Sequence, residues 1–314
     1  MNMNNTATYI YKELRRREIP VEIVSEENSL LRYFYNDEWH MVKSCITDKA
    51  SYPSCHICNT KTLAEIVAAS VDMSVPASTR HESLELSEEF LLEYAPIVVK
   101  PVDAAHGHGV SMNIKSKTDL KKALAIVKKY SKKPAILQQM VKGRDVRILI
   151  IGGKYAAAVR RVPASVIGDG EHTIQELIEM ENKLPHRKDP DVKMRGRMAI
   201  INLSSAKSYL KRKISRIPSA GEEVPVVGVG NTSLGGHAED ATDEIPAEIY
   251  EKAELFAQKL KLPVCGVDIL LDEDGSYHFL EANAAPGFGP HHHPRYGQAR
   301  DVTKMFVDTI LEQA

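Results

Sequence analysis

The sequence lacks the features that define several large classes of protein. It has only four cysteines in 314 residues, too few for a disulfide framework, so we expect free thiols in a reducing cytoplasm. No apolar run approaches the length of a membrane span, so no membrane partner is expected. The first residues have neither a basic region nor an apolar core. No signal peptide is therefore predicted, and a cytoplasmic location is expected.

Charge and short motifs exclude further classes. The formal net charge is −1, which gives no general attraction to nucleic acid, so no nucleic-acid partner is expected. The chain contains neither the Gly-Lys-Ser/Thr of a Walker loop nor the Gly-x-Gly-x-x-Gly of a dinucleotide-binding turn. Strand-like and helix-like segments alternate without a βαβ repeat. We therefore expect an α+β fold, in two or three subdomains.

Local patterns predict most of the elements. A helix over 118–130 is expected to begin at a Thr118 cap, and Thr173 with Glu176 forms a capping box for another helix. The Lys/Arg-rich stretch 185–215 is expected to be a solvated, charged insertion. The other expected helices are 8–18, 61–70, 246–261 and 300–313, and the expected hairpins are 31–42, 146–158 and 265–283.

Oxygen-donor side chains gather on the last of these hairpins. Asp268 lies on its first strand, and Glu281 and Asn283 share one face of the second strand because they are two residues apart. Oxygen ligands suit Mg²⁺, with Mn²⁺ as an alternative. The pattern thus favours a metal site, and a solvated hairpin edge is the alternative that these three residues leave open.

A lysine followed by a Gly/His-rich loop forms a second candidate site. Lys100 lies in a short buried strand at 95–101, and the loop after it contains His106, Gly107 and Gly109. Glycines let backbone N–H groups turn toward an anion, and a lysine at a strand end reaches phosphate oxygens. The loop is a weak signal alone, but it complements the predicted metal hairpin as a phosphate-binding element.

Arginines and a second glycine-containing loop complete the candidates. Arg147, Arg160 and Arg161 lie on the two arms of the 146–158 hairpin, where paired arginines are more often surface residues than site residues. The loop 230–236, which includes Asn231, offers further backbone donors. Cys55-His-Ile-Cys58 is a weak zinc motif because no second ligand pair stands at the usual spacing.

These sequence motifs, in this order along the chain, resemble those of the ATP-grasp superfamily of carboxylate–amine ligases. The resemblance is strongest to the ATP-grasp modules of cyanophycin synthetase and bifunctional glutathione synthetase. The resemblance covers roughly residues 45–300. It implies two α+β subdomains that grip ATP, at 76–142 and 143–314, after an N-terminal α/β region at 1–75. The matching sequence segments are Lys61-Thr-Leu-Ala-Glu, Val98-Val-Lys100-Pro101, Arg160-Arg-Val-Pro-Ala-Ser-Val-Ile-Gly-Asp-Gly-Glu-His-Thr-Ile-Gln-Glu-Leu177, Asn231-Thr-Ser-Leu-Gly-Gly, Gly266-Val-Asp268 and Glu281-Ala-Asn-Ala-Ala-Pro-Gly287.

The resemblance also implies roles for individual residues. Lys61 and Lys100 would contact ATP, the loop 103–111 would close over its phosphates, and Asp268, Glu281 and Asn283 would bind Mg²⁺. The segment from Gln138 through Gln139 to Val141 would hold adenine, Asp145 would contact the ribose, Arg147, Arg161 and less surely Arg160 would hold the transferred phosphoryl group, and His291 would contact a substrate.

Two positions depart from the pattern of the family. The family more often has Glu where this chain has Gln138, which keeps an acceptor for the adenine amino group but loses charge. Many D-alanine–D-alanine-type ligases have arginine where this chain has Gly266. The stabilisation of an oxyanion would then fall to Arg161 and the 230–236 loop.

The function implied is an ATP-dependent, ADP-forming ligase that makes a peptide or amide bond through an acyl phosphate on a small amino acid or peptide. A homodimer is a further expectation, since dimers are common in the superfamily. Two rivals stay open. A phosphotransferase on the same scaffold would stop at a phosphorylated product, and a non-catalytic module would bind ATP without turnover.

Overall fold

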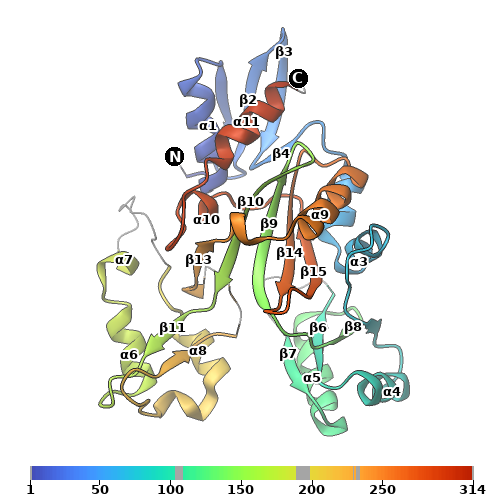
Figure 1. Ribbon diagram of the computed structural model, residues 1–314, viewed down its shortest axis with the longest axis vertical. Coiled ribbons are helices and arrows are strands. Elements are labelled where there is room, and N and C mark those ends of the chain that lie inside the picture. The colour runs from blue at the N-terminus through green and yellow to red at the C-terminus, as the bar shows by residue number, and fades with distance from the viewer. Residues whose placement is uncertain (1, 103–108, 189–198, 229, 231–233, 313–314) are drawn as a thin grey trace.

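The protein, described by a computed structural model over residues 2–102, 109–188, 199–228, 230 and 234–312, is built around one five-stranded antiparallel sheet. The N-terminal region lies at one end of this sheet, and two lobes extend from the other end (Figure 1). The strand order is β13 (His237–Asp240), β10 (Lys154–Val162), β9 (Arg144–Ile151), β14 (Val264–Leu271) and β15 (Tyr277–Asn283).

Both faces of the central sheet are covered, which explains the continuous apolar run in β9. Ile148 and Ile150 face a core that includes α9 (Ala247–Lys259) and α3 (Lys61–Ala69). Leu149 and Ile151 face the opposite core, which includes α1 (Asn5–Arg16) and α11 (Val302–Glu312). A strand with both faces buried has no polar alternation, because successive side chains enter different cores.

The N-terminal region forms its own four-stranded sheet. The order is β1 (Val21–Ser25), β2 (Leu30–Tyr35), β3 (Glu38–Lys43) and β4 (Ile46–Thr47), and α2 (Tyr52–Asn59) follows. The predicted hairpin turns on Asn36 and Asp37, which have φ values of 50° and 62°. Asn and Asp tolerate this left-handed conformation, which two-residue hairpins require.

The small lobe, residues 78–139, is a four-stranded sheet covered by two helices. Its strands are β5 (Ser78–Arg80), β8 (Ala135–Gln139), β6 (Ile97–Pro101) and β7 (Ser111–Ile114), and its helices are α4 (Leu84–Tyr94) and α5 (Lys117–Tyr130). The prediction that Thr118 caps α5 is wrong. Ser116 accepts the hydrogen bond from the backbone N–H of Asp119, at 3.1 Å, because Ser116 keeps an extended backbone and Thr118 already lies within the helix.

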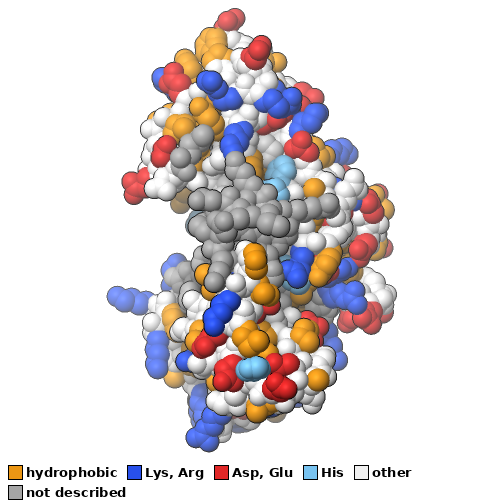
Figure 2. Space-filling model, turned by 90° about the vertical axis from the view of Figure 1, so that its left-hand side faces the viewer, with side chains coloured by type: hydrophobic (Ala, Val, Ile, Leu, Met, Phe, Trp, Pro, Cys, Tyr) orange, Lys and Arg blue, Asp and Glu red, His pale blue; other side chains and the backbone are white. Residues whose placement is uncertain are grey.

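The side lobe, residues 164–227, has a separate core. It comprises β11 (Ser165–Ile167), α6 (Ile174–Glu181), α7 (Pro185–Lys188), α8 (Leu203–Leu210), the 3₁₀ turn η1 (Lys211–Ser215) and β12 (Glu223–Pro225). The expectation of a solvated insertion is wrong for residues 203–215, since Ala206, Leu210 and Ile214 are buried in this core. On the face seen in Figure 2, Lys and Arg side chains are interspersed with acidic ones.

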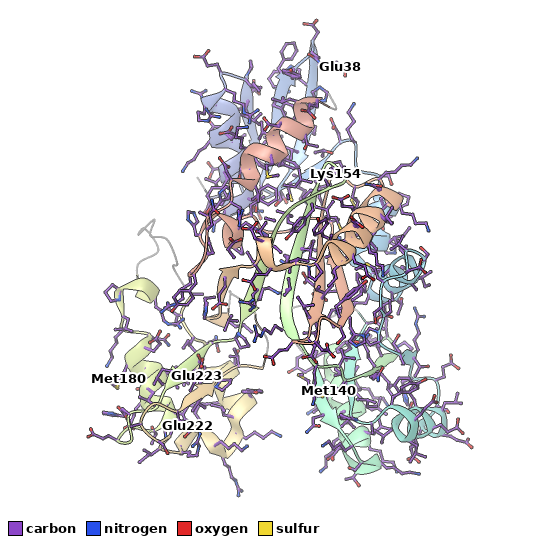
Figure 3. All side chains as sticks on the ribbon, in the orientation of Figure 1. Glu38, Met140, Lys154, Met180, Glu222 and Glu223 are labelled. Atoms are coloured by element: carbon purple, nitrogen blue, oxygen red, sulfur yellow. The ribbon has the colours of Figure 1, made fainter. Side chains whose placement is uncertain are left out.

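The mixture of helices and antiparallel sheets confirms the expected α+β class. Figure 3 places Met140 where the small lobe joins the central sheet, between β8 and β9. Its backbone N–H donates to the carbonyl of Pro96 at 2.9 Å, which fixes the connection. In the part of the chain that the structure describes, no helix combines the length and the apolar character needed to cross a membrane.

Candidate active site

Asp268 lies at the centre of a charged cluster on the central sheet. Arg147 holds it with two hydrogen bonds, Nε to Oδ1 and Nη2 to Oδ2, both at 2.7 Å. The Nη1 atom of Arg161 lies 3.0 Å from Oδ2. Asp268 is fully buried, and in register it stands opposite Arg147 on β9 and Glu281 on β15. The predicted hairpin therefore brings these side chains to one face.

Arg161 joins Asp268 to a second carboxylate. Its Nε and Nη2 atoms donate to Oδ1 of Asp145 at 2.9 and 2.6 Å. Burial raises the pKa of Asp145 to about 6, although the charge of Arg161 opposes this shift. Burial would also raise the pKa of Asp268, but Arg147 and Arg161 outweigh it and hold that pKa below its ordinary value. Asp268 is therefore an anion at neutral pH.

A β-bulge sets the side on which Glu281 lies. Phe279 pairs with Ile269 and Glu281 pairs with Asp268, so the register shifts between these pairs. Phe279 can then fill the core while Glu281 faces the site, where its Oε2 lies 3.8 Å from Nζ of Lys61. Asn283 stands opposite Gly266, and its Oδ1 accepts the N–H of Ala285 at 2.8 Å.

Asp268, Glu281 and Asn283 are the predicted ligands of a divalent cation, and Arg147 and Arg161 already bond to both carboxylate oxygens of Asp268. Asp268 and Glu281 are directly opposed carboxylates, an arrangement that is unfavourable unless positive charge lies between or beside them. Glu281 and Asn283 are partly exposed, and Oδ1 of Asn283 already accepts the N–H of Ala285. The donor set is all oxygen, which is the set Mg²⁺ prefers.

Arg147 occupies the space above Gly266. A Cβ added to Gly266 would lie 3.0 Å from Cβ of Pro286 and 3.6 Å from both Cδ and Nε of Arg147. A long side chain at position 266 would therefore displace Arg147. The side chain of Arg147 thus fills the space beside Gly266, a contact that the sequence alone did not reveal.

The small lobe contributes a second network opposite this cluster. Lys100 Nζ donates to Oε1 of Gln138 at 2.7 Å, and Nε2 of Gln138 donates to Oε1 of Glu65 at 2.9 Å. The hydroxyl of Ser78 donates to the other oxygen of Glu65, also at 2.9 Å. Burial lowers the pKa of Lys100 to about 8, since the carboxylates near it offset only part of the cost of burying its charge.

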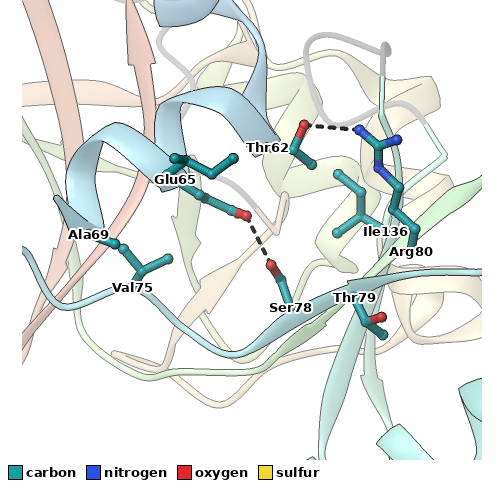
Figure 4. A pocket seen from close by; sticks show the side chains of 9 residues that line it. Thr62, Glu65, Ala69, Val75, Ser78, Thr79, Arg80 and Ile136 are labelled. Atoms are coloured by element: carbon teal, nitrogen blue, oxygen red, sulfur yellow. Dashed lines mark hydrogen bonds between the residues drawn. The ribbon is translucent and has the colours of Figure 1, made fainter.

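A pocket of about 380 Å³ lies beside this network, between α3 and the sheet of the small lobe (Figure 4). The Glu65–Ser78 hydrogen bond forms part of its wall, and Arg80 donates to Thr62 across it at 3.3 Å. The lining side chains come from Thr62, Glu65, Ile66, Ala69, Val75, Ser78, Thr79, Arg80 and Ile136.

The structure does not bring every predicted residue into these networks. Arg160 pairs with Glu239 at 2.9 Å and with Glu244 at 2.5 Å, away from Asp268, because consecutive residues of β10 face opposite sides. His291, on α10 (Gly289–His292), is 1% exposed, and within the described part of the chain neither ring nitrogen has a hydrogen-bond partner. Burial, together with the charge of Arg147, lowers the pKa of His291 to about 3, so its ring is neutral.

Of the remaining predicted residues, Gln139 ends β8, and Val141 and Gly109 lie in connecting segments. The N–H of Gln139 donates to the carbonyl of Ala77 at 2.8 Å, and Val141 follows at the junction of the small lobe. Gly109 has a φ of 74°, and a Cβ there would meet Pro101 at 2.9 Å, so only glycine fits. His106, Gly107 and Asn231 lie outside the described residues.

Sequence reasoning missed Glu65 and Ser78. Glu65 is 7% exposed, although glutamate is seldom buried without a partner. The available signal was its position as the only acidic residue in the apolar helix Lys-Thr-Leu-Ala-Glu-Ile-Val-Ala-Ala. A lone acid on the buried face of an apolar helix indicates an internal hydrogen-bond partner.

Comparisons with known proteins bear on the family and the fold. The family model described as prokaryotic glutathione synthetase, ATP-grasp domain, matches residues 64–203. Cyanophycin synthetase from Trichormus variabilis is 31% identical over 316 residues, which is 96% of this chain and 34% of the relative. The glutathione biosynthesis bifunctional protein GshAB from Listeria monocytogenes is 30% identical over 99% of this chain and 42% of the relative.

The fold is similar as well. The crystal structure of a bifunctional glutathione synthetase from Pasteurella multocida superposes with a TM-score of 0.69 at 26% identity, covering 100% of this chain and 44% of that chain. The chain thus spans well under half the length of each of these relatives. It contains an ATP-grasp domain, and it has the ATP-grasp fold that its motifs predicted.

Proposed function

We propose that the protein is an ATP-dependent, ADP-forming carboxylate–amine ligase that acts on a small amino acid or peptide. The observation that carries the proposal is the Asp268–Arg147–Arg161 cluster, which lies on the same sheet face as Glu281 and next to Lys61. Phosphoryl transfer needs positioning and neutralised charge more than a protein nucleophile, and this cluster supplies both.

In this proposal ATP is held between the small lobe and the central sheet. Lys61 and Lys100 bind phosphate oxygens, Asp145 contacts the ribose, and the junction 138–141 holds the adenine. Asp268, Glu281 and Asn283 hold Mg²⁺ (or Mn²⁺), which neutralises charge on the phosphates when bound. With the subdomain boundaries that the resemblance implies, 76–142 and 143–314, we propose that the nucleotide binds between the small lobe and the central sheet.

The reaction then has two steps. A carboxylate oxygen of the substrate attacks the γ-phosphorus, an acyl phosphate forms, and ADP leaves. The amine nitrogen of the second substrate attacks the acyl carbon, the C–O bond breaks, and phosphate leaves while the nitrogen loses a proton. Arg147 and Arg161, already oriented by Asp268 and Asp145, are placed to hold the phosphoryl oxygens.

Neutral His291 and the loop 230–236 are proposed to contact the substrates. A ring that stays neutral beside Arg147 offers one donor and one acceptor, which suits an amine or a carboxylate group better than a phosphate. The loop 103–111 is proposed to cover the phosphates, because water would hydrolyse an acyl phosphate. The expected compartment is the cytoplasm.

The test is product formation. The protein is incubated with Mg-ATP and pooled amino acids and dipeptides, while ADP and phosphate are measured and products are identified by mass. We expect ADP release that requires both a carboxylate and an amine, and a product lighter than their sum by one water. Asp268→Ala should abolish it. Glu273→Ala, which removes an exposed ion pair with Arg144, should leave it unchanged.

Two results would contradict the proposal. A phosphorylated product that forms without any amine would identify a phosphotransferase. Tight binding of Mg-ATP with no turnover of any pool would favour a binding module.

A further inference from the structure

The side-chain amide of Gln138 is held at both ends by charged groups of opposite sign. Its oxygen accepts from Lys100 Nζ at 2.7 Å, and its nitrogen donates to Glu65 Oε1 at 2.9 Å. Gln138 is 4% exposed and Lys100 is 9% exposed, so water does not compete for these bonds. The two ends of the amide therefore have fixed partners within the protein.

Only one orientation of this amide is compatible with its neighbours. An ammonium group has donors and no acceptor, and a carboxylate has acceptors and no donor. Rotation of the amide by 180° would place its NH₂ against the ammonium and its oxygen against the carboxylate. Donors would then face donors at the Lys100 end, and acceptors would face acceptors at the Glu65 end. Both ends of the amide would be buried without a hydrogen bond, which is energetically unfavourable.

The fixed orientation has a consequence for base recognition. A carbonyl oxygen has two lone pairs, so Oε1 of Gln138 can accept a second hydrogen bond beside that of Lys100. Adenine carries an amino donor at C6, whereas guanine carries a carbonyl acceptor at the same carbon. An oxygen presented to the base therefore attracts adenine and repels guanine, and an NH₂ presented there would do the reverse.

We propose that Glu65 is a positioning residue that selects adenine over guanine nucleotides by fixing the amide of Gln138. The inference rests on the proposed function, in which the junction 138–141 holds the base. Glu65 is the more constant of the two partners because Lys100 is also expected to donate to phosphate when a nucleotide binds. Glu65 is held in turn by Ser78 and lies on a helix packed against the central sheet.

The hydrogen bond between Gln138 and Glu65 also explains how this chain can have glutamine at position 138. Where the family more often has a glutamate, this chain has a neutral amide with a carboxylate one hydrogen bond further away, on α3. The acceptor that adenine needs is kept. The negative charge is moved from β8 to α3, where it still lies near enough to Lys100 to raise its pKa against the effect of burial.

The experiment measures the Kd of Mg-ATP and of Mg-GTP by calorimetry for the wild type and three variants. We expect the wild type to prefer ATP, so that the Kd of Mg-GTP divided by the Kd of Mg-ATP is well above one. Glu65→Ala should reduce this ratio by about tenfold, which is the free-energy equivalent of one hydrogen bond to a charged group. Glu65→Gln, which can still offer an oxygen to Gln138, should recover most of the ratio. Thermal unfolding checks that each variant is folded.

Ser78→Ala is the matched control. It removes the other hydrogen bond of Glu65 but leaves Gln138 untouched, so the ratio should stay within about twofold of the wild type. A folded Glu65→Ala protein with the wild-type ratio would overturn the inference and leave the proposed ligase intact. A wild type that binds neither nucleotide would overturn the proposed function, and this inference with it.

Discussion

At the scale of single residues, Lys100 differs from the other buried charges of the site. Asp268 and Arg147 neutralise each other in a two-bond ion pair, whereas Lys100 donates to the neutral amide oxygen of Gln138. Burial without a directly bonded carboxylate lowers the pKa of Lys100 to about 8. The charge of this lysine is therefore sensitive to pH near the physiological range.

We expect the affinity for Mg-ATP to fall as pH rises through about 8, because Lys100 loses the charge that attracts phosphate. Calorimetry between pH 7 and pH 9.5 measures this as an increase in Kd of about tenfold. Lys100→Arg keeps its charge over this range, so its profile should be flat. A wild-type Kd that does not change between these pH values would contradict the prediction.

The lowered pKa of Lys100 has the opposite effect on folding stability, which gains as pH rises while the affinity for Mg-ATP falls. Between pH 8 and the ordinary lysine pKa of 10.5, the unfolded chain keeps the proton that the folded protein has lost. The contribution of Lys100 to the free energy of unfolding must therefore rise with pH in this window. Urea denaturation of the wild type and of Lys100→Met, compared at pH 7.5 and pH 9.5, separates this contribution from those of other groups.

The sequence predicted which residue types form the site better than it predicted which way they point. Arg160 and Arg161 are consecutive on a strand, so period 2 alone already required that only one of them face Asp268. Choosing between them needed the register of β10 against β9. Glu65 could not be assigned at all, because its partners Gln138 and Ser78 become neighbours only when α3 packs against the small lobe.

At the scale of elements, the main error concerned residues 203–215. Their many lysines and arginines favoured a solvated insertion, but Ala206, Leu210 and Ile214 recur at intervals of four residues and form an apolar face. The basic side chains lie on the opposite, exposed face. High charge content therefore concealed a weak amphipathic signal. The strands and hairpins, with stronger alternation and clear turn residues, were predicted well.

One buried arginine joins this lobe to the loop near the active site. The side chain of Arg187 is 3% exposed, its Nε donates to Glu181 at 2.8 Å, and its Nη1 donates to the carbonyls of Ala199 and Gly235 at 2.7 and 2.9 Å. Gly235 belongs to the loop 230–236, which is proposed to contact the substrates. Arg187 thus links α6, the segment before α8 and this loop.

We expect Arg187→Met to reduce turnover by about tenfold or more, because a misplaced loop holds the reacting groups poorly. The Kd of Mg-ATP should stay within about twofold, since Arg187 bonds to Glu181, Ala199 and Gly235, which are not among the residues proposed to bind ATP. Arg216→Met is the control, as it removes an exposed pair with Glu222 in the same lobe and should change neither quantity. Equal losses of turnover and of ATP affinity would argue against a role through the loop.

At the scale of the whole molecule, the described residues form four buried clusters, two on the central sheet and one in each lobe. Clusters that share few side chains can open separately. The residues proposed to bind ATP are divided between the small lobe, which carries Lys100 and Gln138, and the central sheet, which carries Asp268. A bound nucleotide would therefore hold these two parts together.

Hydrogen exchange provides the last test. At a hundred times its Kd, Mg-ATP should slow exchange about a hundredfold in β8 and β14 wherever exchange requires the two parts to separate, because the ligand binds only the joined state. Helices α6 and α8 should exchange at unchanged rates, since the side lobe has its own core and carries none of the proposed ATP contacts. Asp268→Ala should lose the protection. Slowing of equal size in the side lobe would mean that the nucleotide stabilises the molecule as one unit, and absence of protection in β8 would mean that ATP does not bridge the small lobe and the central sheet.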